Sequence, residues 1–100
     1  MNYTAQFPTA AIQKKFYKEL AHLKKSEQSV VLDVIRSLEH DPRPFGRKPF
    51  KQLVPPIVLY QFAAQYRIRI GNHRVLYDVD DQKKIVWIFA LRKRNEATYS

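Results

Sequence analysis

Two alternating segments joined by a short turn constrain the fold of this chain more than any other feature. Residues 66–70 read Tyr-Arg-Ile-Arg-Ile, residues 73–79 alternate again, and Gly71-Asn72 separates them. Strict alternation is typical of a half-buried strand, and a two-residue turn of this kind is typical of a β-hairpin. Such a hairpin sets Arg69 opposite Arg74. Because directly opposed residues point to the same face, one face carries Arg67, Arg69 and Arg74, and the apolar residues take the other.

Two helices are predicted to cover the apolar face. Apolar residues recur at helical spacing from Ile12 to Leu23 and from Val31 to Leu38. Thr9 and Ser26 are suitable N-caps for these helices. The sequence at residues 40–42, His-Asp-Pro, ends the second helix because the residue before a proline avoids helical geometry. Since almost nothing separates the helices, we expect an antiparallel hairpin.

The remaining segments complete a small sheet. Residues 2–7 alternate, residues 57–62 form one apolar run, and residues 84–91 are apolar on both faces, as in a central strand. Residues 41–56 contain five of the six prolines and are expected to form a surface loop. The prediction is one α+β domain over residues 1–100, with an antiparallel-rich four-stranded sheet in the order β-α-α-β-β-β and the helix hairpin packed on one face.

The positive charge is concentrated in the second half of the chain. The formal net charge is +9, and residues 42–100 hold twelve basic and only four acidic residues. Such an excess attracts polyanions, with nucleic acid as the first candidate and an anionic membrane surface as the second. The alternative is a soluble domain that happens to be basic. Within the predicted loop the candidate contacts to nucleic acid are Arg47, Lys48 and Lys51.

The opposed arginines indicate an anion-binding face. Like charges in register destabilise a strand pair, whereas a phosphate between them is gripped by both guanidinium groups. The alternative is that the arginines splay into solvent and are neutralised by acids such as Asp78. The next hairpin, with its turn at residues 80–83, is expected to set Gly71 opposite Arg92. That register brings further groups to this face: Arg92, Lys93 and Arg94 beside the Arg74 end, an exposed Phe89, and Tyr99 folding back from the tail. Basic groups interleaved with aromatic rings suit single-stranded RNA.

The residue inventory excludes several chemistries. There is no cysteine, no glycine-rich phosphate loop and no pair of close carboxylates, and the three histidines fall on different predicted elements. No metal and no cofactor are therefore expected. The absence of cysteine suits a reducing cytoplasm, no signal peptide is recognised, and the longest apolar run is too short to span a membrane. Metal-free RNA cleavage by a 2′-hydroxyl remains open, with arginines stabilising the added charge. Clustered cations favour the proton-accepting form of a neighbouring group, such as Lys93 or Tyr99.

The order of elements and three local segments resemble the RelE/ParE toxin superfamily of toxin–antitoxin pairs. The segments are residues 66–70, residues 71–77 (Gly-Asn-His-Arg-Val-Leu-Tyr) and residues 92–99. The resemblance implies that Arg67 and Arg69 bind and orient RNA and take part in catalysis, at positions that are often lysine in this family. It further implies that Arg74 stabilises the transition state, that Lys93 or Arg94 serves the phosphate, and that Tyr99 stacks on the message.

The resemblance also implies a target and partners. RelE-type toxins cleave messenger RNA in the ribosomal A site without metal, and an antitoxin protein neutralises them in a hetero-oligomer. ParE-type members instead poison DNA gyrase and lack the set of basic residues and tyrosine. We therefore predict a cytoplasmic, ribosome-dependent endoribonuclease toxin that acts on messenger RNA and the 70S ribosome. The alternatives are a gyrase inhibitor of the same fold and a non-catalytic RNA-binding module.

Overall fold

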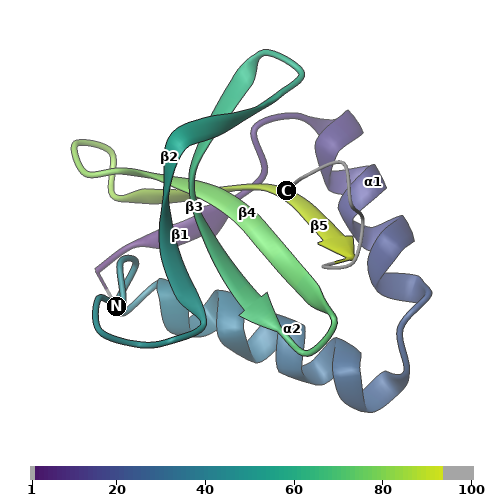
Figure 1. Ribbon diagram of the computed structural model, residues 1–100. Coiled ribbons are helices and arrows are strands. Elements are labelled where there is room, and N and C mark those ends of the chain that lie inside the picture. The colour runs from purple at the N-terminus through teal and green to yellow at the C-terminus, as the bar shows by residue number, and fades with distance from the viewer. Residues whose placement is uncertain (1, 94–100) are drawn as a thin grey trace.

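A five-stranded sheet with two helices on one face forms the described part of the chain, residues 2–93 of a computed structural model (Figure 1). In chain order the elements are β1 (Thr4–Gln6), α1 (Ala10–Ala21), α2 (Lys25–Leu38), β2 (Phe50–Leu59), β3 (Phe62–Ile70), β4 (His73–Asp80) and β5 (Ile85–Lys93). The strand order in the sheet is β1-β5-β4-β3-β2, with β1 parallel to β5 and the other neighbours antiparallel. The predicted α+β class is confirmed, and the sheet has five strands where four were predicted.

The β3–β4 hairpin has the predicted register. Ile70 lies opposite His73, Arg69 opposite Arg74, and Arg67 opposite Leu76. Gly71 in the turn has a φ of 58°, a conformation that glycine adopts without steric penalty. The turn chemistry and the alternation agree, so this hairpin is specified locally.

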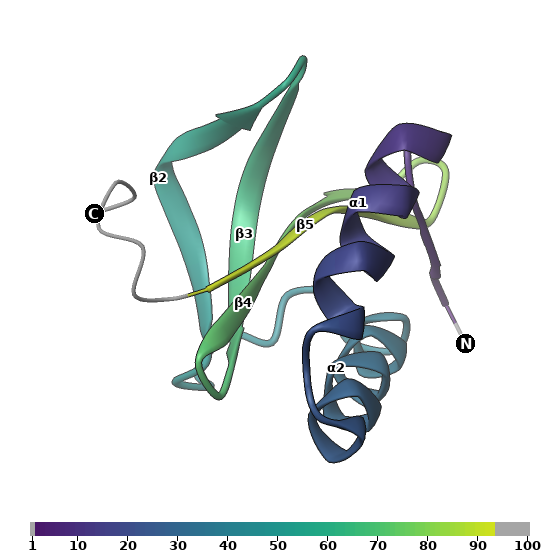
Figure 2. The same ribbon diagram turned by 90° about the vertical axis from the view of Figure 1, so that its right-hand side faces the viewer.

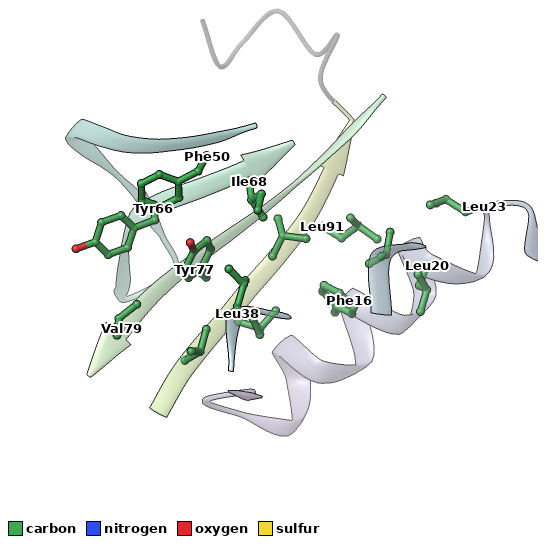
Figure 3. Close-up of a cluster of buried hydrophobic side chains, with 14 residues drawn as sticks. Phe16, Leu20, Leu23, Leu38, Phe50, Tyr66, Ile68, Tyr77, Val79 and Leu91 are labelled. Atoms are coloured by element: carbon green, nitrogen blue, oxygen red, sulfur yellow. The ribbon is translucent and has the colours of Figure 1, made fainter. Parts of the chain in front are cut away.

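The main core lies between the helices and one face of the sheet. Figure 2 shows both helices on the same side of the strands, and Figure 3 shows their side chains meeting those of the sheet. Phe16 and Leu38 supply the helical side of this core, and Tyr77 at the centre of β4 is fully buried. The strand residues in it follow the predicted alternation: Tyr66, Ile68, Val75, Tyr77 and Val79. The predicted placement of the helices on the apolar face is therefore confirmed.

One of the two predicted helix caps is confirmed. The Thr9 hydroxyl oxygen accepts a hydrogen bond from the Ile12 backbone N–H at 3.1 Å, so Thr9 caps α1. The prediction for Ser26 is wrong, because α2 already begins at Lys25. The Glu27 carboxylate accepts a hydrogen bond from the Lys24 backbone N–H at 3.1 Å, which satisfies a donor of the helix entry.

The prediction of a surface loop over residues 41–56 is wrong from Phe50 onward, where β2 begins. β2 lies at the edge of the sheet, where a proline removes no hydrogen bond from a neighbouring strand on its open side. Pro55 and Pro56 lie in an irregular stretch between Gln52 and Ile57, where pairing with β3 shifts. The strand then ends at Leu59, and Tyr60 turns the chain with a φ of 59°.

The β4–β5 hairpin differs from the prediction in register. Arg92 lies opposite Arg74 and not opposite Gly71. The turn occupies residues 81–84, with Lys84 at a φ of 58°, so Asp80 pairs with Ile85. A bulge then leaves Phe89 as an extra residue on β5, because bulges set two residues against one.

Phe89 is buried, which contradicts its predicted exposure beside Arg74. Only 5% of its surface is exposed, and its ring stacks on that of Phe62 with 5.3 Å between ring centroids. It belongs to a second apolar cluster with Leu59, Ala64 and Leu76. The unpredicted turn at Tyr60 brings Phe62 to this ring, so Phe89 supports the fold and does not offer a surface for stacking bases.

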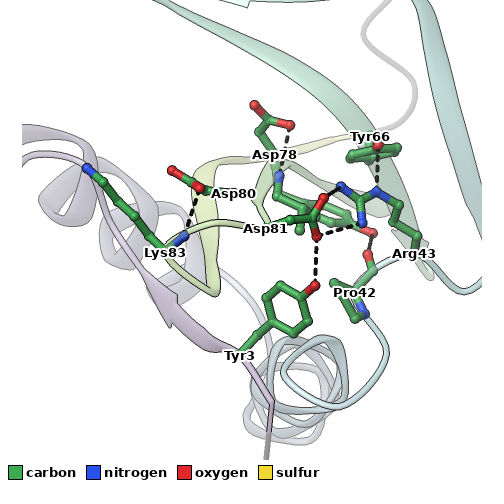
Figure 4. A network of polar contacts seen from close by, with 10 residues as sticks. Tyr3, Pro42, Arg43, Tyr66, Asp78, Asp80, Asp81 and Lys83 are labelled. Carbon is green, nitrogen blue, oxygen red and sulfur yellow. Dashed lines mark hydrogen bonds and ion pairs between the residues drawn. The ribbon is translucent and has the colours of Figure 1, made fainter.

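A polar network joins Arg43, in the segment before β2, to Tyr66 of β3 and to Asp81 in the turn between β4 and β5 (Figure 4). Arg43 donates two hydrogen bonds to the Asp81 carboxylate, at 2.8 and 3.1 Å, and a third from Nε to the Tyr66 hydroxyl at 2.8 Å. The Tyr3 hydroxyl donates to the same carboxylate at 2.7 Å. These bonds, those of Arg43 first, lower the pKa of Asp81 from 3.8 to about 2. The Tyr77 hydroxyl donates to the Pro42 carbonyl at 2.7 Å, and burial raises the pKa of Tyr77 above its ordinary value.

Neither of the two described helices is long and apolar enough to cross a membrane.

Candidate functional site

Three arginines lie side by side on adjacent strands, on the face of the sheet opposite the helices. Arg69 of β3 pairs with Arg74 of β4, and Arg74 pairs with Arg92 of β5. We call these three residues the arginine row. Because neighbouring strands lie about 4.8 Å apart, the three side chains leave the sheet within about 10 Å of one another. The row therefore brings three positive charges close together on one face of the sheet.

Two further cations extend the row toward β2. Arg67 precedes Arg69 by two residues and shares its face, and its Nη1 donates a hydrogen bond of 2.6 Å to the Pro49 carbonyl. The same carbonyl accepts the backbone N–H of Arg69 at 2.9 Å. Lys51 lies directly opposite Arg67. We call these five residues the cationic face: Lys51, Arg67, Arg69, Arg74 and Arg92.

The burial of these side chains suits a binding surface. All four arginines are half-buried and Lys51 is exposed. The buried side chain of Leu76 lies opposite Arg67, on the same face. Guanidinium groups held against such apolar surroundings lose part of their hydration, which strengthens their attraction for an anion. The face can therefore hold a phosphodiester through several forked hydrogen bonds at once.

The nearest acid along β4 interacts with another part of the molecule. Asp78 follows Leu76 by two residues on the same face, and its Oδ1 accepts the Val79 backbone N–H at 2.8 Å. Burial raises the pKa of Asp78, and the positive charge that opposes this rise is that of Arg43. The cation that acts on the Asp78 carboxyl is therefore Arg43 of the polar network in Figure 4. This observation gives no support to the predicted alternative in which Asp78 neutralises the arginines.

The other predicted site residues divide into three groups. Lys93 lies opposite His73 and shares its face, and His73 Nε2 lies 3.4 Å from the Glu19 carboxylate of α1. Lys93 is therefore not part of the arginine row. Arg47 and Lys48 are exposed in the segment before β2. Arg94 and Tyr99 lie outside the described residues, so their predicted roles stay predictions.

Sequence reasoning placed two of the site residues only loosely. Lys51 was assigned to a loop, although its pairing with Arg67 makes it part of the sheet. Arg92 was predicted opposite Gly71, beside the Arg74 end of the neighbouring strand, whereas it pairs with Arg74 itself and completes the row. The signal for Lys51 is the apolar Phe50 immediately before it, which is buried in the main core. Over residues 2–93 no cluster of three or more histidine, aspartate or glutamate side chains is arranged to hold a metal ion.

Comparisons with known proteins place this geometry in a family context. A family model described as "ParE toxin of type II toxin-antitoxin system, parDE" matches residues 9–98. No curated protein sequence matches the chain. Among solved structures, the chain is similar to the archaeal RelE–RelB complex from Pyrococcus horikoshii OT3, with 26% identity, a TM-score of 0.73, and coverage of 96% of this chain and 99% of that one.

Two other solved structures share the fold. The toxin–antitoxin complex RelBE2 from Mycobacterium tuberculosis matches with 23% identity and a TM-score of 0.63, over 94% of this chain and 100% of that one. The isolated E. coli RelE toxin matches with 17% identity and a TM-score of 0.52, over 97% of this chain and 92% of that one. At these identities the likeness concerns the fold alone.

Proposed function

This chain belongs to the ParE toxin family of type II toxin–antitoxin systems, within the RelE/ParE superfamily, and we propose that it acts as a ribosome-dependent endoribonuclease on messenger RNA. The observation that supports this proposal is the arginine row on the face opposite the helices. A cognate antitoxin is its expected protein partner, because two of the similar solved structures are toxin–antitoxin complexes.

The reaction proposed for this face needs no metal. The 2′-oxygen of one ribose attacks the adjacent phosphorus, the bond from phosphorus to the 5′-oxygen breaks, and a 2′,3′-cyclic phosphate and a 5′-hydroxyl end result. The 2′-hydroxyl proton passes to a base, and the leaving 5′-oxygen takes up a proton. In the transition state negative charge builds up on the phosphoryl oxygens, and fixed cations that face them lower the barrier.

The cationic face provides this stabilisation. Arg74 lies between Arg69 and Arg92, so a phosphoryl group centred on it is reached by guanidinium groups from three strands. Arg67 is held in place by the Pro49 carbonyl. Because a guanidinium group hardly deprotonates, these residues bind and polarise and do not accept the proton. Lys93 and Tyr99 stay the predicted proton acceptors, and the position of Lys93 opposite His73 favours Tyr99.

Inhibition of DNA gyrase is the second candidate function, and the match to the ParE family model favours it. A toxin of that kind binds a protein target and has no need of several arginines in register on one face. Like charges opposed across a ladder destabilise the sheet, and a phosphate bound between them turns this repulsion into attraction. We therefore rank the ribonuclease first.

Primer extension on transcripts from growth-arrested cells tests the proposal. Cells that express the chain are expected to show messages cut at defined positions within translated codons. Arg74→Ala is expected to remove these cuts and relieve the arrest, at a loss of about a hundredfold or more. Lys83→Ala is the matched control, because it removes the same charge from an exposed turn residue at the other end of β4.

Two results would contradict the ribonuclease. Intact transcripts together with gyrase-linked DNA breaks would identify the gyrase inhibitor. Salt-dependent binding to free RNA, with no cleavage on translating ribosomes, would identify a non-catalytic RNA-binding module.

A further inference from the structure

A second row of side chains crosses the sheet on the face opposite the helices. Trp87 of β5 lies directly opposite Asp78 of β4, and on its other side it lies opposite Gln6 of β1. Asp78 follows Arg74 by four residues on β4. Because side chains alternate between the two faces along a strand and paired residues share a face, all three lie on the face of the arginine row. We call Gln6, Trp87 and Asp78 the Trp87 row.

Apolar surface joins the two rows. Leu76 and Ala90 lie opposite each other between them, and both belong to the second apolar cluster. Four residues of β4 separate Arg74 from Asp78, which at about 3.3 Å per residue places the rows about 13 Å apart. Neighbouring nucleotides of an extended strand can span such a distance. A strand held on the arginine row therefore reaches the Trp87 row along one face, without passing an edge of the sheet.

Trp87 is placed to act as a stacking platform. Its side chain is half-buried: part of it packs on the second apolar cluster, and the rest reaches solvent. Its backbone is paired on both sides, with β1 and with β4, so the ring is held in place before any ligand binds. Aromatic rings on the face of a sheet stack on the unpaired bases of single-stranded RNA, and a ring that is already fixed loses little freedom in doing so.

Asp78 adds a hydrogen-bond acceptor beside the ring. Its Oδ1 accepts the Val79 backbone N–H at 2.8 Å, which orients the carboxylate (Figure 4). A carboxylate has about four acceptor sites, so it can accept a further hydrogen bond from a base. Aspartate accepts from the N4 amino group of cytosine, whereas uracil has an oxygen at that position. A phosphate would be repelled by this carboxylate, so the Trp87 row suits the neutral base of a nucleotide and not its backbone.

We propose that the Trp87 row binds one base of the RNA strand that the arginine row holds by its phosphate. The base stacks on Trp87, and Asp78 accepts a hydrogen bond from its exocyclic amino group. The proposal rests on the ribonuclease function and deepens it, because it makes the chain select an amino-bearing base such as cytosine close to the cut. The shared face of the two rows supports it, as does the change from cations at one end of that face to an aromatic ring and a carboxylate at the other.

The fluorescence of Trp87 tests the stacking directly, because it is the one tryptophan of the chain. Short single-stranded RNA with 2′-methoxy riboses cannot be cleaved, and its binding is expected to change the indole emission of the purified protein. With a labelled probe, fluorescence anisotropy gives Kd. Trp87→Leu is expected to raise Kd about tenfold and Trp87→Phe much less, because phenylalanine keeps an aromatic ring. Tyr17→Leu, which removes an exposed ring from α1 on the other face, is the matched control and should change Kd less than twofold.

Two probes that differ only in carrying cytidines or uridines test the role of Asp78. The wild type is expected to bind the cytidine probe about tenfold more tightly, as one hydrogen bond to a charged group predicts. Asp78→Asn should bring the two Kd values within about twofold, because an amide both donates and accepts. Asp33→Asn on the exposed surface of α2 should leave the preference unchanged. On ribosomes, wild-type cut sites should favour an amino-bearing base at one fixed position, and Asp78→Asn should lose this preference.

The outcomes separate this proposal from the one on which it rests. If RNA binds with no change in indole emission, and Trp87→Leu with an unchanged melting temperature keeps the wild-type Kd, the strand does not cross this end of the sheet. The proposal is then overturned while the ribonuclease stands. Equal affinity of the wild type for both probes, with cut sites that favour no base, overturns the assignment of an amino-bearing base. Failure of the ribonuclease itself shows as wild-type protein that does not cut transcripts on ribosomes.

Discussion

Removing one charge from the arginine row is expected to stabilise the folded chain while it abolishes activity. Arg69 and Arg74 are directly opposed on neighbouring strands. Two unit charges about 4.5 Å apart in a water-like medium repel by about 0.9 kcal/mol. Cross-strand pairs measured in other sheets contribute about 0.2–1 kcal/mol. We therefore expect Arg69→Gln to raise the free energy of unfolding by about 0.2–1 kcal/mol.

Urea denaturation at two salt concentrations is the assay for this effect. At about 0.1 M salt the Debye length is about 10 Å, so the repulsion across the ladder is felt, whereas at about 1 M salt it falls to about 3 Å. The gain in stability of Arg69→Gln should therefore be present at low salt and vanish at high salt. In cleavage assays the same variant should lose most of its activity.

Arg67→Gln provides the matched comparison. Arg67 lies opposite Leu76 on β4 and opposite Lys51 on β2, and it donates a hydrogen bond to the Pro49 carbonyl, so its loss relieves one cross-strand repulsion but also removes a contact. Because the lost hydrogen bond contributes about 0.5–1.5 kcal/mol and the relieved repulsion about 0.2–1 kcal/mol, Arg67→Gln is expected to show no net gain in the free energy of unfolding. If Arg69→Gln destabilises the chain, or if its gain persists at high salt, the row is not mutually repulsive. The argument that an anion belongs between these arginines would then fail.

Three further outcomes follow from particular residues. Because folding lowers the pKa of Asp81 from 3.8 to about 2, the stability that the Asp81 carboxylate adds is complete above about pH 4 and is lost as the pH falls toward 2. The melting temperatures of the wild type and Asp81→Asn should therefore converge over that interval, and a constant difference between them would contradict the ion pair with Arg43. Lys51→Ala should slow cleavage about tenfold and Lys51→Arg much less, because charge at this site binds phosphate; equal losses would instead indicate proton transfer by Lys51. Phe89→Ala should lower the free energy of unfolding by about 3–5 kcal/mol. A folded Phe89→Leu variant should still cleave RNA, and loss of cleavage in that variant would show that the Phe89 ring contacts the message.

The part of the fold that the sequence predicts is the part that local chemistry specifies. Alternation and the Gly71-Asn72 turn define the β3–β4 register, and the apolar spacing defines both helices. The course of β2 was missed because its prolines are typical of a loop, and only its position at the sheet edge makes them tolerable. The turn at Tyr60 carries no glycine, proline or asparagine, so nothing in the local sequence signals it.

The candidate site was predictable to the same extent. Three of its arginines follow from one hairpin, whereas Arg92 and Lys51 depend on a bulge and an edge strand formed by tertiary contacts. Bulges add one residue to a strand and leave no composition signal in a single sequence. The placement of Phe89 failed for a related reason, because the turn at Tyr60, which brings Phe62 onto this ring, has no signal in the local sequence.

Burial of apolar side chains on one face of the sheet explains how the chain tolerates like charges directly opposite one another on the other face. On β4, Val75 and Tyr77 are fully buried against the helices, and burial of a large apolar side chain contributes about 1.5–3 kcal/mol. The repulsion within the row is smaller than the contribution of either residue, so the sheet forms despite it. A bound phosphate reverses the sign of that repulsion, and a ligand that binds only the folded state adds its own stabilisation. A phosphate held by Arg69, Arg74 and Arg92 gains from the same charges that otherwise repel one another, and this gain is the physical reason for proposing RNA as the ligand of the face that the helices leave open.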